Sequence, residues 1–544
     1  MKLVTVPEML AVEKEADASG LTYAQMMENA GRNLAKEVLS LPYGKVDEPE
    51  VLALVGPGNN GGDALVALAL LAANGWRVRA YLVKRPVKGD ELAARLVEAG
   101  GETLSAEDDP DFDQLDAFIG TATILLDGLL GTGIRLPVKE DVAKVLAAAK
   151  DSLLGLDWPP YIVAVDCPSG VDSDSGAADE CVIPADMTVT MAAVKRGLLS
   201  LPAFDLLGEL RLAGIGDLSE LEAWKAVKNF VADEDLVASI LPERPSDAHK
   251  GTFGTAMIAA GSVNYTGAAL LAGEAAYRVG AGLVTLAVPS PLHAALAGQL
   301  PEATWVLLPH ELGVVSGPAA EVLFKNLERA TSLLLGPGFG TEDATREFIE
   351  NLLTGKSTPK KVAARIGFVH EAQEKQDENN FELPPMVVDA DGLKLLAKLE
   401  NWPGLLPASA VLTPHPGEMA VLTGLAKDEI QADRLGTALR FAKEWGHVVA
   451  LKGAFTVVAA PDGRTATVPV ASSALARAGT GDVLAGLIVG LRAQGVEAFE
   501  SAVAGAWIHA QAGLYAADAL GGTASVLAGD VLAYVPDVLS DIGE

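Results

Sequence analysis

The sequence predicts an α/β protein of two domains, each built around a mainly parallel sheet. Its 544 residues are too many for one ordinary hydrophobic core. Half of the residues are hydrophobic, and short, continuously apolar runs alternate with helical stretches along the chain. Such runs are typical of strands that are buried on both faces of a parallel sheet. We therefore expect three layers in each domain, with helices on both faces of the sheet.

The order of the expected elements supports this prediction in both halves. Strands are expected in the first half at residues 51–55, 76–83, 124–126 and 162–165. Two helices are expected before them within residues 8–40, and a buried helix is expected at 64–73. Strands are expected in the second half at residues 255–259, 283–288, 332–335, 386–388, 410–412 and 448–451. Helices are expected between these strands at 267–279, 430–445 and 480–494, among others.

A charged stretch at 233–244 precedes the second series of strands. We place the domain boundary shortly before it, which gives domains 1–225 and 226–544. The stretch 355–385 is polar and rich in Lys, Glu, Gln and Asn, and it separates a predicted helix from a predicted strand. We expect it to be a surface insertion or a mobile loop.

The composition argues against several classes of function. The formal net charge is −31, and nucleic acid or an anionic membrane requires a basic face. The two cysteines are too few for a disulfide framework, and the seven histidines are scattered singly, which indicates no zinc site. No apolar run is long enough to span a bilayer, and the start of the chain lacks the apolar region of a signal peptide. We expect a cytoplasmic protein, and the sequence leaves open whether it forms a homo-oligomer.

Three glycine-rich loops follow predicted strands in the first half, at 56–63, 127–137 and 166–172. The carboxyl ends of parallel strands are where α/β proteins bind ligands. Glycine lets the backbone approach a phosphate closely, and Asn, Asp and Ser oxygens can hold a hard cation. Each loop alone is also an ordinary turn. Three such loops at equivalent ends of one sheet predict a phosphate-bearing ligand, one ion and an acid, but no particular reaction.

The most informative stretch of the second half is Gly479-Thr480-Gly481-Asp482, which precedes an apolar helix. Small residues at a helix N-terminus can close around a phosphate. A carboxylate beside a bound anion is unfavourable unless it handles a proton, although helix capping also favours Asp near a helix start.

Other loops of the second half also lie beside predicted strand ends, at 249–254, 261–268, 336–340, 389–392, 413–418 and 452–456. Taken singly, His415 is a loop histidine bonded to backbone, and Lys452 is a surface lysine at a strand end. One convergent site explains these loops more simply than independent turns do. Lys452 beside a glycine and a hydroxyl residue suits phosphate contacts.

Three motifs of the first half resemble those of the NAD(P)H-hydrate epimerase family: Gly-Pro-Gly-Asn-Asn-Gly-Gly-Asp at 56–63, Asp-Gly-Leu-Leu-Gly-Thr-Gly at 127–133 and Asp-Cys-Pro-Ser-Gly at 166–170. With an upstream helix at 26–31, the match covers about the first 215 residues. The resemblance implies a Rossmann-like domain with potassium among Asn60, Asp127 and Ser169, and Asp166 as the acid or base of C6 epimerisation. The residues implied to contact the hydrated nicotinamide nucleotide are Asn59, Asn60, Gly61, Gly62, Asp63, Gly131, Thr132, Gly133, Ile134, Arg135, Leu136, Pro137 and Asp166. Ala64 departs from the family, in which Gly is usual, and its methyl group could crowd the ligand.

The second half combines His-Lys-Gly, Gly-Pro-Gly-x-Gly, Asp-Ala-Asp-Gly, Thr-Pro-His-Pro-Gly-Glu and Lys-Gly-Ala-x-Thr with the Gly-Thr-Gly-Asp loop. Over about 235–535 this set resembles the ribokinase-like fold and, within it, the ADP-dependent NAD(P)H-hydrate dehydratases. The resemblance implies ADP as phosphoryl donor, Mg²⁺ in this domain, and Asp482 as the general base. The residues implied to contact the substrate are Ala268, Gly338, His415 and Asp482. Those implied to bind the nucleotide are Lys452, Gly453, Ala454, Phe455, Thr456 and Gly481. Ser472-Ser473 and Ala478 depart from the family, in which Asn and Gly are frequent at these positions, and both departures lie in the region implied to bind the nucleotide.

Together the two resemblances imply a bifunctional repair enzyme for NADHX and NADPHX. The first domain would interconvert the R and S hydrates, and the second would dehydrate the S form with ADP, giving AMP and phosphate. One alternative is a ribokinase-type small-molecule kinase with an ancillary nucleotide-binding domain. Another is that the first half is a non-catalytic nucleotide-binding or RNA-associated module.

Overall fold

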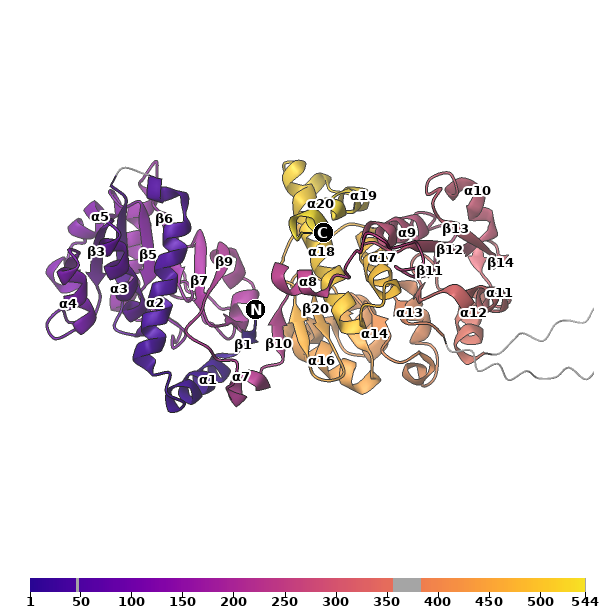
Figure 1. The fold of residues 1–544 in the computed structure, drawn as a ribbon, viewed down its shortest axis with the longest axis horizontal. Helices are drawn as coiled ribbons and strands as arrows, with labels where there is room; N and C mark the ends of the chain where they lie inside the picture. Colours follow the sequence, from indigo (N-terminus) through magenta and orange to yellow (C-terminus); the bar gives the residue numbers. More distant parts are fainter. Residues whose placement is uncertain (46–47, 356–382, 544) are drawn as a thin grey trace, which may run out of the picture. The chain divides into compact units, whose positions relative to one another are not determined.

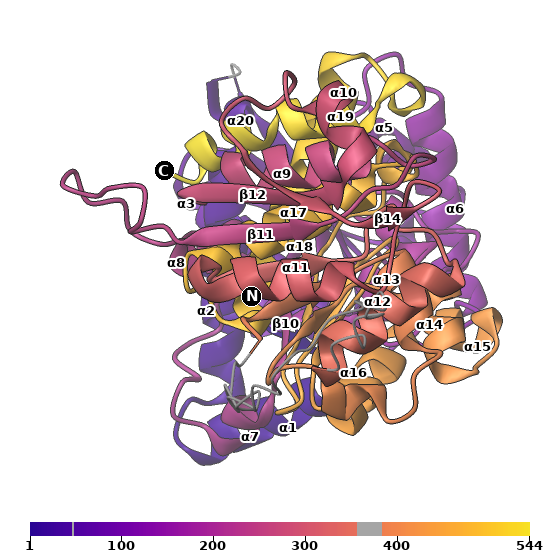
Figure 2. The same cartoon turned by 90° about the vertical axis from the view of Figure 1, so that its right-hand side faces the viewer.

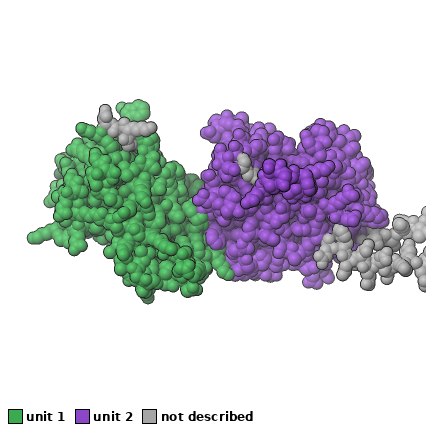
Figure 3. Space-filling model, in the orientation of Figure 1, with its two compact units in different colours: residues 1–229 green, residues 230–544 purple. Residues whose placement is uncertain are grey.

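The computed structural model describes residues 1–45, 48–355 and 383–543. The chain divides into two compact units, Met1–Asn229 and Phe230–Glu544, which Figure 3 shows in green and purple. This division lies close to the boundary that we placed at 225/226. Most of the polar stretch that we expected to be a surface insertion, namely 356–382, lies outside the described residues.

A seven-stranded parallel sheet forms the centre of the first unit, in the order β4-β3-β2-β5-β6-β7-β9 (Figure 1). Its strands are β2 (Glu50–Val55), β3 (Arg77–Leu82), β4 (Glu102–Ser105), β5 (Ile124–Gly128), β6 (Tyr161–Val165), β7 (Met187–Met191) and β9 (Glu209–Ala213). A separate short pair, β1 (Leu3–Val4) and β8 (Val194–Lys195), joins the start of the chain to the segment that follows β7.

Helices cover both faces of this sheet. They are α1 (Val6–Ala18), α2 (Tyr23–Ser40), α3 (Asn59–Ala73), α4 (Glu91–Glu98), α5 (Asp113–Ile119) and α6 (Glu140–Leu154), with the short α7 (Glu222–Ala226) near the end of the unit. Successive side chains of a strand point to opposite faces. Val51, Ala53 and Val55 of β2 therefore pack with α1, α2 and α3, whereas Leu52 and Leu54 pack with α5 and α6. The predicted three-layer arrangement is confirmed in this unit.

A ten-stranded sheet forms the centre of the second unit, in the order β10-β21-β20-β19-β18-β17-β16-β11-β12-β13. Its pairings from β19 to β13 are parallel, and β20 is antiparallel to both β19 and β21. Its strands are β10 (Asn229–Val231), β11 (Thr255–Ala259), β12 (Leu283–Pro289), β13 (Thr304–Leu308), β16 (Ser332–Leu335), β17 (Met386–Val388), β18 (Val411–Leu412), β19 (Val448–Leu451), β20 (Val457–Ala459) and β21 (Thr465–Thr467). A small antiparallel pair, β14 (His310–Glu311) and β15 (Val314–Val315), stands apart from it.

The second unit also has helices on both faces of its sheet. They are α8 (Glu234–Ile240), α9 (Ala268–Arg278), α10 (His293–Leu296), α11 (Ala319–Asn326), α12 (Asp343–Thr354), α13 (Asp391–Leu396), α14 (Pro416–Thr423), α15 (Lys427–Ala432), α16 (Arg434–Trp445), α17 (Thr480–Ala493), α18 (Ala498–Ala519), α19 (Ala528–Ala533) and α20 (Val535–Asp541). Ala256 and Ile258 of β11 pack with α9, α17 and α18, whereas Met257 and Ala259 pack with α11, α12 and α16. Figure 2 shows α9 beside β11 and β12.

Small residues bring α9 and α17 close together. A Cβ atom on Gly486 of α17 would lie 2.4 Å from the Ala272 carbonyl oxygen of α9, so no larger residue fits there without moving a helix. This close packing fixes the N-terminus of α17, which carries the Gly-Thr-Gly-Asp loop, against the sheet.

Some predicted elements differ from the structure. The helix expected at 64–73 begins at Asn59, so residues 59–63, expected as a loop, form the first turn of α3. The helix expected at 430–445 is two helices, because Asp433 interrupts it and caps α16 by accepting a hydrogen bond from the Gly436 backbone N–H. The sheet strands that the sequence did not reveal are β4, β7, β9, β10, β13, β20 and β21. Most of them carry Thr or charged residues where an uninterrupted apolar run was sought.

Strand order reverses once in each parallel array, between β2 and β5 in the first unit and between β11 and β16 in the second. In open α/β sheets such reversals open a crevice at the carboxyl ends of the strands, where ligands bind. The loops that follow β2, β5 and β6, and those that follow β11, β16 and β17, lie at these edges. Among the described residues, none of the helices combines the length and the apolar character needed to cross a bilayer.

Candidate active sites

Asp166 directly follows β6 at the carboxyl edge of the first sheet. Its backbone has φ 66°, a left-handed conformation that is uncommon for residues other than glycine and clusters at functional sites. One carboxylate oxygen of Asp166 accepts hydrogen bonds from the Met191 backbone N–H at 2.9 Å and the Thr190 hydroxyl at 3.1 Å. The same oxygen contacts the ammonium group of Lys195. Asp166 and Lys195 are both buried, so this ion pair is shielded from solvent.

Two further acids lie near this ion pair. Asp63 is buried in the first turn of α3, and Glu13 is half-buried on α1. Burial raises the pKa of Asp63 well above its usual range, and the negative charges of Asp166 and Glu13 raise it further. Burial also raises the pKa of Glu13. The site therefore combines one lysine with three carboxyl groups. Our sequence predictions included Asp63 and Asp166 but not Lys195 or Glu13.

Of the three residues predicted to surround potassium, Asn60 and Ser169 contact the backbone of Leu130, and Asp127 contacts Ser169. The Asn60 amide donates to the carbonyl oxygens of Leu130 at 3.1 Å and Val165 at 2.6 Å. The Ser169 hydroxyl accepts from the Leu130 N–H at 2.9 Å and donates to Asp127 at 2.5 Å. The second carboxylate oxygen of Asp127 accepts from the Ser169 N–H at 2.7 Å. Asp127 is buried, and burial raises its pKa.

The glycines of the loop after β2 permit close backbone contacts. A Cβ atom on Gly56 would lie 1.8 Å from the Leu129 carbonyl oxygen, and one on Gly61 would lie 2.1 Å from the Gly56 carbonyl oxygen. Ala64, where the family usually has Gly, is fully buried against Gly128. Its methyl group is therefore core, and the expectation that it could crowd a ligand is not supported. The remaining predicted contact residues form the partly exposed loop 131–137 after β5.

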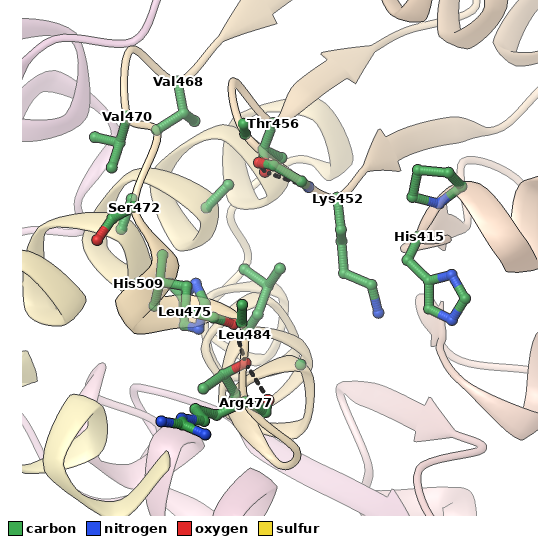
Figure 4. Close-up of a pocket in the computed structure, with 18 residues that line it drawn as sticks. His415, Lys452, Thr456, Val468, Val470, Ser472, Leu475, Arg477, Leu484 and His509 are labelled. Atoms are coloured by element: carbon green, nitrogen blue, oxygen red, sulfur yellow. Dashed lines mark hydrogen bonds between the residues drawn. The ribbon is translucent and has the colours of Figure 1, made fainter. Parts of the chain in front are cut away.

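A cavity of about 420 Å³ opens beside the N-terminus of α17 in the second unit. Of the predicted nucleotide residues, the cavity lining includes Lys452, Gly453, Ala454, Thr456 and Gly481. Phe455 is buried and does not line it. Figure 4 shows His415 and Lys452 on one side of the cavity and Val468 and Val470 on the opposite side. The cavity thus has a charged end and an apolar end.

Side chains that the sequence did not reveal form the apolar end of the cavity. They come from the segment after β21, from α17 and from α18, and they include Val468, Val470, Leu475, Leu484, Ala506 and Ala510. Ser472, which departs from the family pattern, also lines the cavity, and its hydroxyl accepts a hydrogen bond from the Ala474 N–H at 3.2 Å. Ala478, the other departure, is exposed and is not part of the lining. No local motif marks these apolar residues as a site, because they resemble ordinary core positions.

Lys452 is the centre of a network of ionisable side chains at the charged end. Its ammonium lies 2.5 Å from a carboxylate oxygen of Asp389 and 3.9 Å from one of Glu418. The same Asp389 oxygen accepts from the Thr413 hydroxyl at 2.7 Å. Asp389 and Glu418 are buried, and both follow strand ends within motifs that the sequence analysis quoted. Lys452 is therefore not an isolated surface lysine, because it lines the cavity and pairs with a buried carboxylate.

Asp482 lies in the first turn of α17, half-buried beside this network. Burial raises its pKa to about 7, and the negative charge of Asp389 adds to the shift, while Lys452 opposes it. A carboxyl group with a pKa near 7 can accept and return a proton at neutral pH.

His415 has a structural role as well as a place in the cavity. Its Nδ1 atom accepts hydrogen bonds from the backbone N–H groups of Gly417 at 2.9 Å and Glu418 at 3.3 Å, which caps α14. Burial lowers its pKa, so the neutral imidazole that this cap requires is favoured. His415 is therefore bonded to backbone and also lines the cavity, and its role in binding a substrate stays a prediction.

Ala268 and Gly338, the other predicted substrate residues, adjoin each other outside the cavity. A Cβ atom on Gly338 would lie 2.9 Å from the Ala268 Cβ, and the Gly261 N–H donates to the Pro337 carbonyl at 2.8 Å. This places them at the strand-order reversal between β11 and β16. The His-Lys-Gly loop at 249–251 precedes β11 and so lies at the opposite, amino edge of the sheet.

Two family models match the chain. The model described as NAD(P)H-hydrate dehydratase matches residues 256–536, and the model described as YjeF-related protein N-terminus matches residues 23–197. Each match falls within one of the two compact units.

The chain is also similar to proteins over its full length. It is 34% identical to the bifunctional NAD(P)H-hydrate repair enzyme Nnr of Moorella thermoacetica, with 100% of this chain and 98% of that protein covered. It is 34% identical to the Escherichia coli K12 protein of the same name, with coverages of 97% and 92%. Among solved structures, an ADP/ATP-dependent NAD(P)H-hydrate dehydratase from Bacillus subtilis, co-crystallised with ATP and Mg²⁺, is 27% identical. It covers 57% of this chain and 98% of its own, with a TM-score of 0.45.

We expect Asp482→Asn to stabilise the second unit above pH 7 and to have no effect on its stability near pH 4. The usual Asp pKa is 3.8 and the folded-state value is about 7, so between these values only the unfolded chain is ionised and stability falls as the pH rises. The gain above pH 7 is on the order of 4 kcal/mol at most. Hydrogen exchange of α17 amides in the full chain at several pH values measures this gain in the stability of the second unit.

Asp518→Asn, an exposed change on α18, is the matched control and should show no such pH-dependent gain. An equal gain from Asp482→Asn at pH 4 and pH 8 would contradict the assigned ionisation.

Proposed function

The chain belongs to the family of bifunctional NAD(P)H-hydrate repair enzymes, and we propose that each unit supplies one of the two activities. The first unit would interconvert the R and S hydrates of NADH and NADPH. The second unit would dehydrate the S hydrate with ADP as phosphoryl donor. The observation that carries this proposal is that the full-length similarity coincides with two separate groups of buried titratable residues, one at the carboxyl edge of each sheet.

For the first unit, we propose that Asp166 is the base of C6 epimerisation. Its carboxylate is held by two hydrogen bonds and one ion pair, which fixes the direction in which it can accept a proton. The loops at 59–63 and 131–137 would hold the phosphates and ribose of the hydrate, since glycines there bring backbone N–H groups close to a ligand. The second hypothesis, a non-catalytic module, gives no reason for a buried ion pair at this edge.

Potassium would be held by Asn60, Asp127 and Ser169. The Asn60 amide, the Ser169 hydroxyl and the Asp127 carboxylate lie close together, linked through the Leu130 backbone and through the bond between Ser169 and Asp127. Amide, hydroxyl and carbonyl oxygens with a single carboxylate suit a hard cation of low charge better than a transition metal. A bound cation would fix the loop after β5 and offset the buried charge of Asp127.

For the second unit, we propose that the cavity holds the adenine nucleotide. Its apolar end suits the flat base, and the loop at 452–456 with Gly481 suits the phosphates, since Lys452 supplies positive charge there. ADP is the donor that the sequence resemblance implies. Ala268, Gly338, His415 and Asp482 would then contact the hydrated nicotinamide.

Asp482 would take the proton from the C6 hydroxyl. The oxygen of that hydroxyl would attack the β-phosphorus of ADP, and AMP would leave. The resulting phosphate would then leave C6 while C5 loses a proton, which restores the C5=C6 double bond of the dihydronicotinamide. The backbone N–H groups of residues 479–481 at the α17 N-terminus would stabilise the charge on the transferred group.

Mg²⁺ would enter with the nucleotide phosphates. Within residues 1–45, 48–355 and 383–543, no group of three or more His, Cys, Asp or Glu side chains could hold a metal ion. Two carboxylates, Asp389 and Glu418, nevertheless lie beside Lys452 at the charged end. This suits Mg²⁺, which usually binds through one or two carboxylates together with substrate phosphates. When bound, Mg²⁺ would neutralise phosphate charge.

A cytoplasmic location and a homo-oligomeric state stay predictions from the sequence.

We expect a mixture of R and S hydrates to be converted completely to NADH or NADPH by the full chain with ADP and Mg²⁺. Recovery of the dihydronicotinamide absorbance measures the reaction, and parallel runs with ATP determine the preferred donor. A folded protein that recovers no NAD(P)H contradicts the proposal. Formation of a stable phosphorylated alcohol from another substrate would favour the ribokinase-type alternative.

We expect two isosteric variants to separate the activities. Asp166→Asn should dehydrate the S hydrate at the normal rate and leave the R hydrate unconverted, because the base of the first unit is lost. Asp482→Asn should epimerise normally but lose dehydration by about 100-fold or more while still binding ADP. Chiral chromatography of the remaining hydrates and calorimetry with ADP are the measurements. Equal loss of both activities in either variant would contradict the assignment of one activity to each unit.

We expect epimerisation to require potassium while dehydration of the pure S hydrate in the same sample continues. Replacing K⁺ with tetramethylammonium, which is too large for the group around Leu130, should slow R-to-S conversion and leave the second unit as an internal control. Asp127→Asn should weaken this potassium dependence because it removes the only carboxylate of the predicted set. Unchanged conversion without potassium would rule out the ion site.

A further inference from the structure

We propose that Asp63 is the second proton-transfer group of the epimerase site and that Lys195 is a positioning residue that holds Asp166 as its partner. This inference rests on the proposed function of the first unit and deepens it. The proposed function names one acid or base, Asp166. Asp63 is a second carboxyl group of this site, and its environment differs from that of Asp166.

Asp63 is a buried carboxyl group without a protein partner. Its exposed fraction is 6%, and across the described parts of the chain no hydrogen bond or ion pair reaches its side chain. Buried polar groups in proteins are nearly always hydrogen-bonded. A carboxyl group left in this state at the ligand edge of a sheet points to a partner on the ligand.

The surroundings of Asp63 favour its protonated form. Burial raises its pKa, and Asp166 and Glu13 raise it further, while the positive charge of Lys195 opposes them. The charged neighbours of Asp63 are Asp166 in the loop after β6, Glu13 on α1 and Lys195 in β8. Asp63 is therefore suited to donate a proton.

Lys195 acts through Asp166 rather than on a ligand. An ammonium group has three donors, and all three of its partners are protein atoms: the Asp166 carboxylate, the Thr190 hydroxyl at 3.1 Å and the Met191 carbonyl at 2.9 Å. Lys195 is 1% exposed, so a ligand cannot reach it. It fixes the position of the Asp166 carboxylate.

The two carboxyl groups can move the two protons that inversion at C6 requires. Asp166 takes the proton of the C6 hydroxyl, the C6–N1 bond breaks with its electron pair on N1, and N1 takes the proton of Asp63. Rotation about C5–C6 then presents the other face of the new carbonyl group to N1. The reverse steps close the ring, return both protons and leave the opposite configuration, so no oxidant or further reactant is needed.

The first test is Asp63→Asn in the full chain, with pure R hydrate as substrate. We expect kcat for R-to-S conversion to fall about 100-fold or more, as the loss of a general acid does, with S-hydrate dehydration unchanged. The wild-type rate should decline on the alkaline side as Asp63 loses its proton, and this decline should be absent from the residual activity of Asp63→Asn. Asp111→Asn, an exposed change in the same unit, is the matched control.

The second test is Lys195→Met, with the exposed Lys139→Met as its control. Because Lys195 positions Asp166 and does not contact a ligand, we expect kcat to fall by about 100-fold while KM stays unchanged. Hydrogen exchange across β6 and β7 checks that the unit is folded. If this variant does not fold, Asp63→Asn still tests the inference, because it exchanges groups of equal size.

The outcomes separate the inference from the proposed function. A wild-type chain that does not interconvert the hydrates overturns the function of the first unit itself. A wild-type chain that does so, with normal kcat and an unchanged pH profile in Asp63→Asn, overturns the inference alone. A raised KM with normal kcat in Lys195→Met overturns its positioning role.

Discussion

A lysine that holds a buried carboxylate at the carboxyl end of a parallel strand is the interaction on which each site depends. Lys195 contacts Asp166 directly after β6, and Lys452 lies 2.5 Å from Asp389 directly after β17. Removing two charges from water is costly and is repaid only by good geometry and further hydrogen bonds. A parallel sheet meets this requirement, because neighbouring strands end at the same edge and their following loops converge there.

Beside each ion pair stands a second carboxyl group with a raised pKa. Asp63 lies in the first turn of α3 and Asp482 in the first turn of α17. The dipole of a helix N-terminus favours the ionised form, yet burial and neighbouring acids outweigh it in both cases. Each unit therefore combines a carboxyl group held by a lysine with a second one whose pKa is raised, and two carboxyl groups in different environments suit acid–base chemistry.

The fold and the strand-end residues were largely predictable from sequence, because glycine-rich loops after apolar runs are local signals. The residues that surround these strand-end residues in each site were not predictable. Lys195 follows β7, whose alternating Met and Thr residues conceal a buried strand, and Glu13 looks like a surface residue of an amphipathic helix. Val468 and Val470 resemble core positions until the cavity is seen. The expectation that the Ala64 methyl group could crowd a ligand came from the motif alone. Whether a methyl group faces a ligand or the core depends on packing that no motif records.

The Gly-Thr-Gly-Asp loop lies between the cavity of the second unit and the region of Asp482, Ala268 and Gly338. Thr480 and Gly481 line the cavity, whereas Asp482 and the adjoining pair Ala268 and Gly338 do not. Successive residues at a helix start point in different directions, so one tight loop can face a nucleotide with its backbone and a second ligand with the next side chain. Group transfer between two ligands requires this arrangement, because the phosphate and the proton acceptor must meet while the two ligands occupy separate spaces.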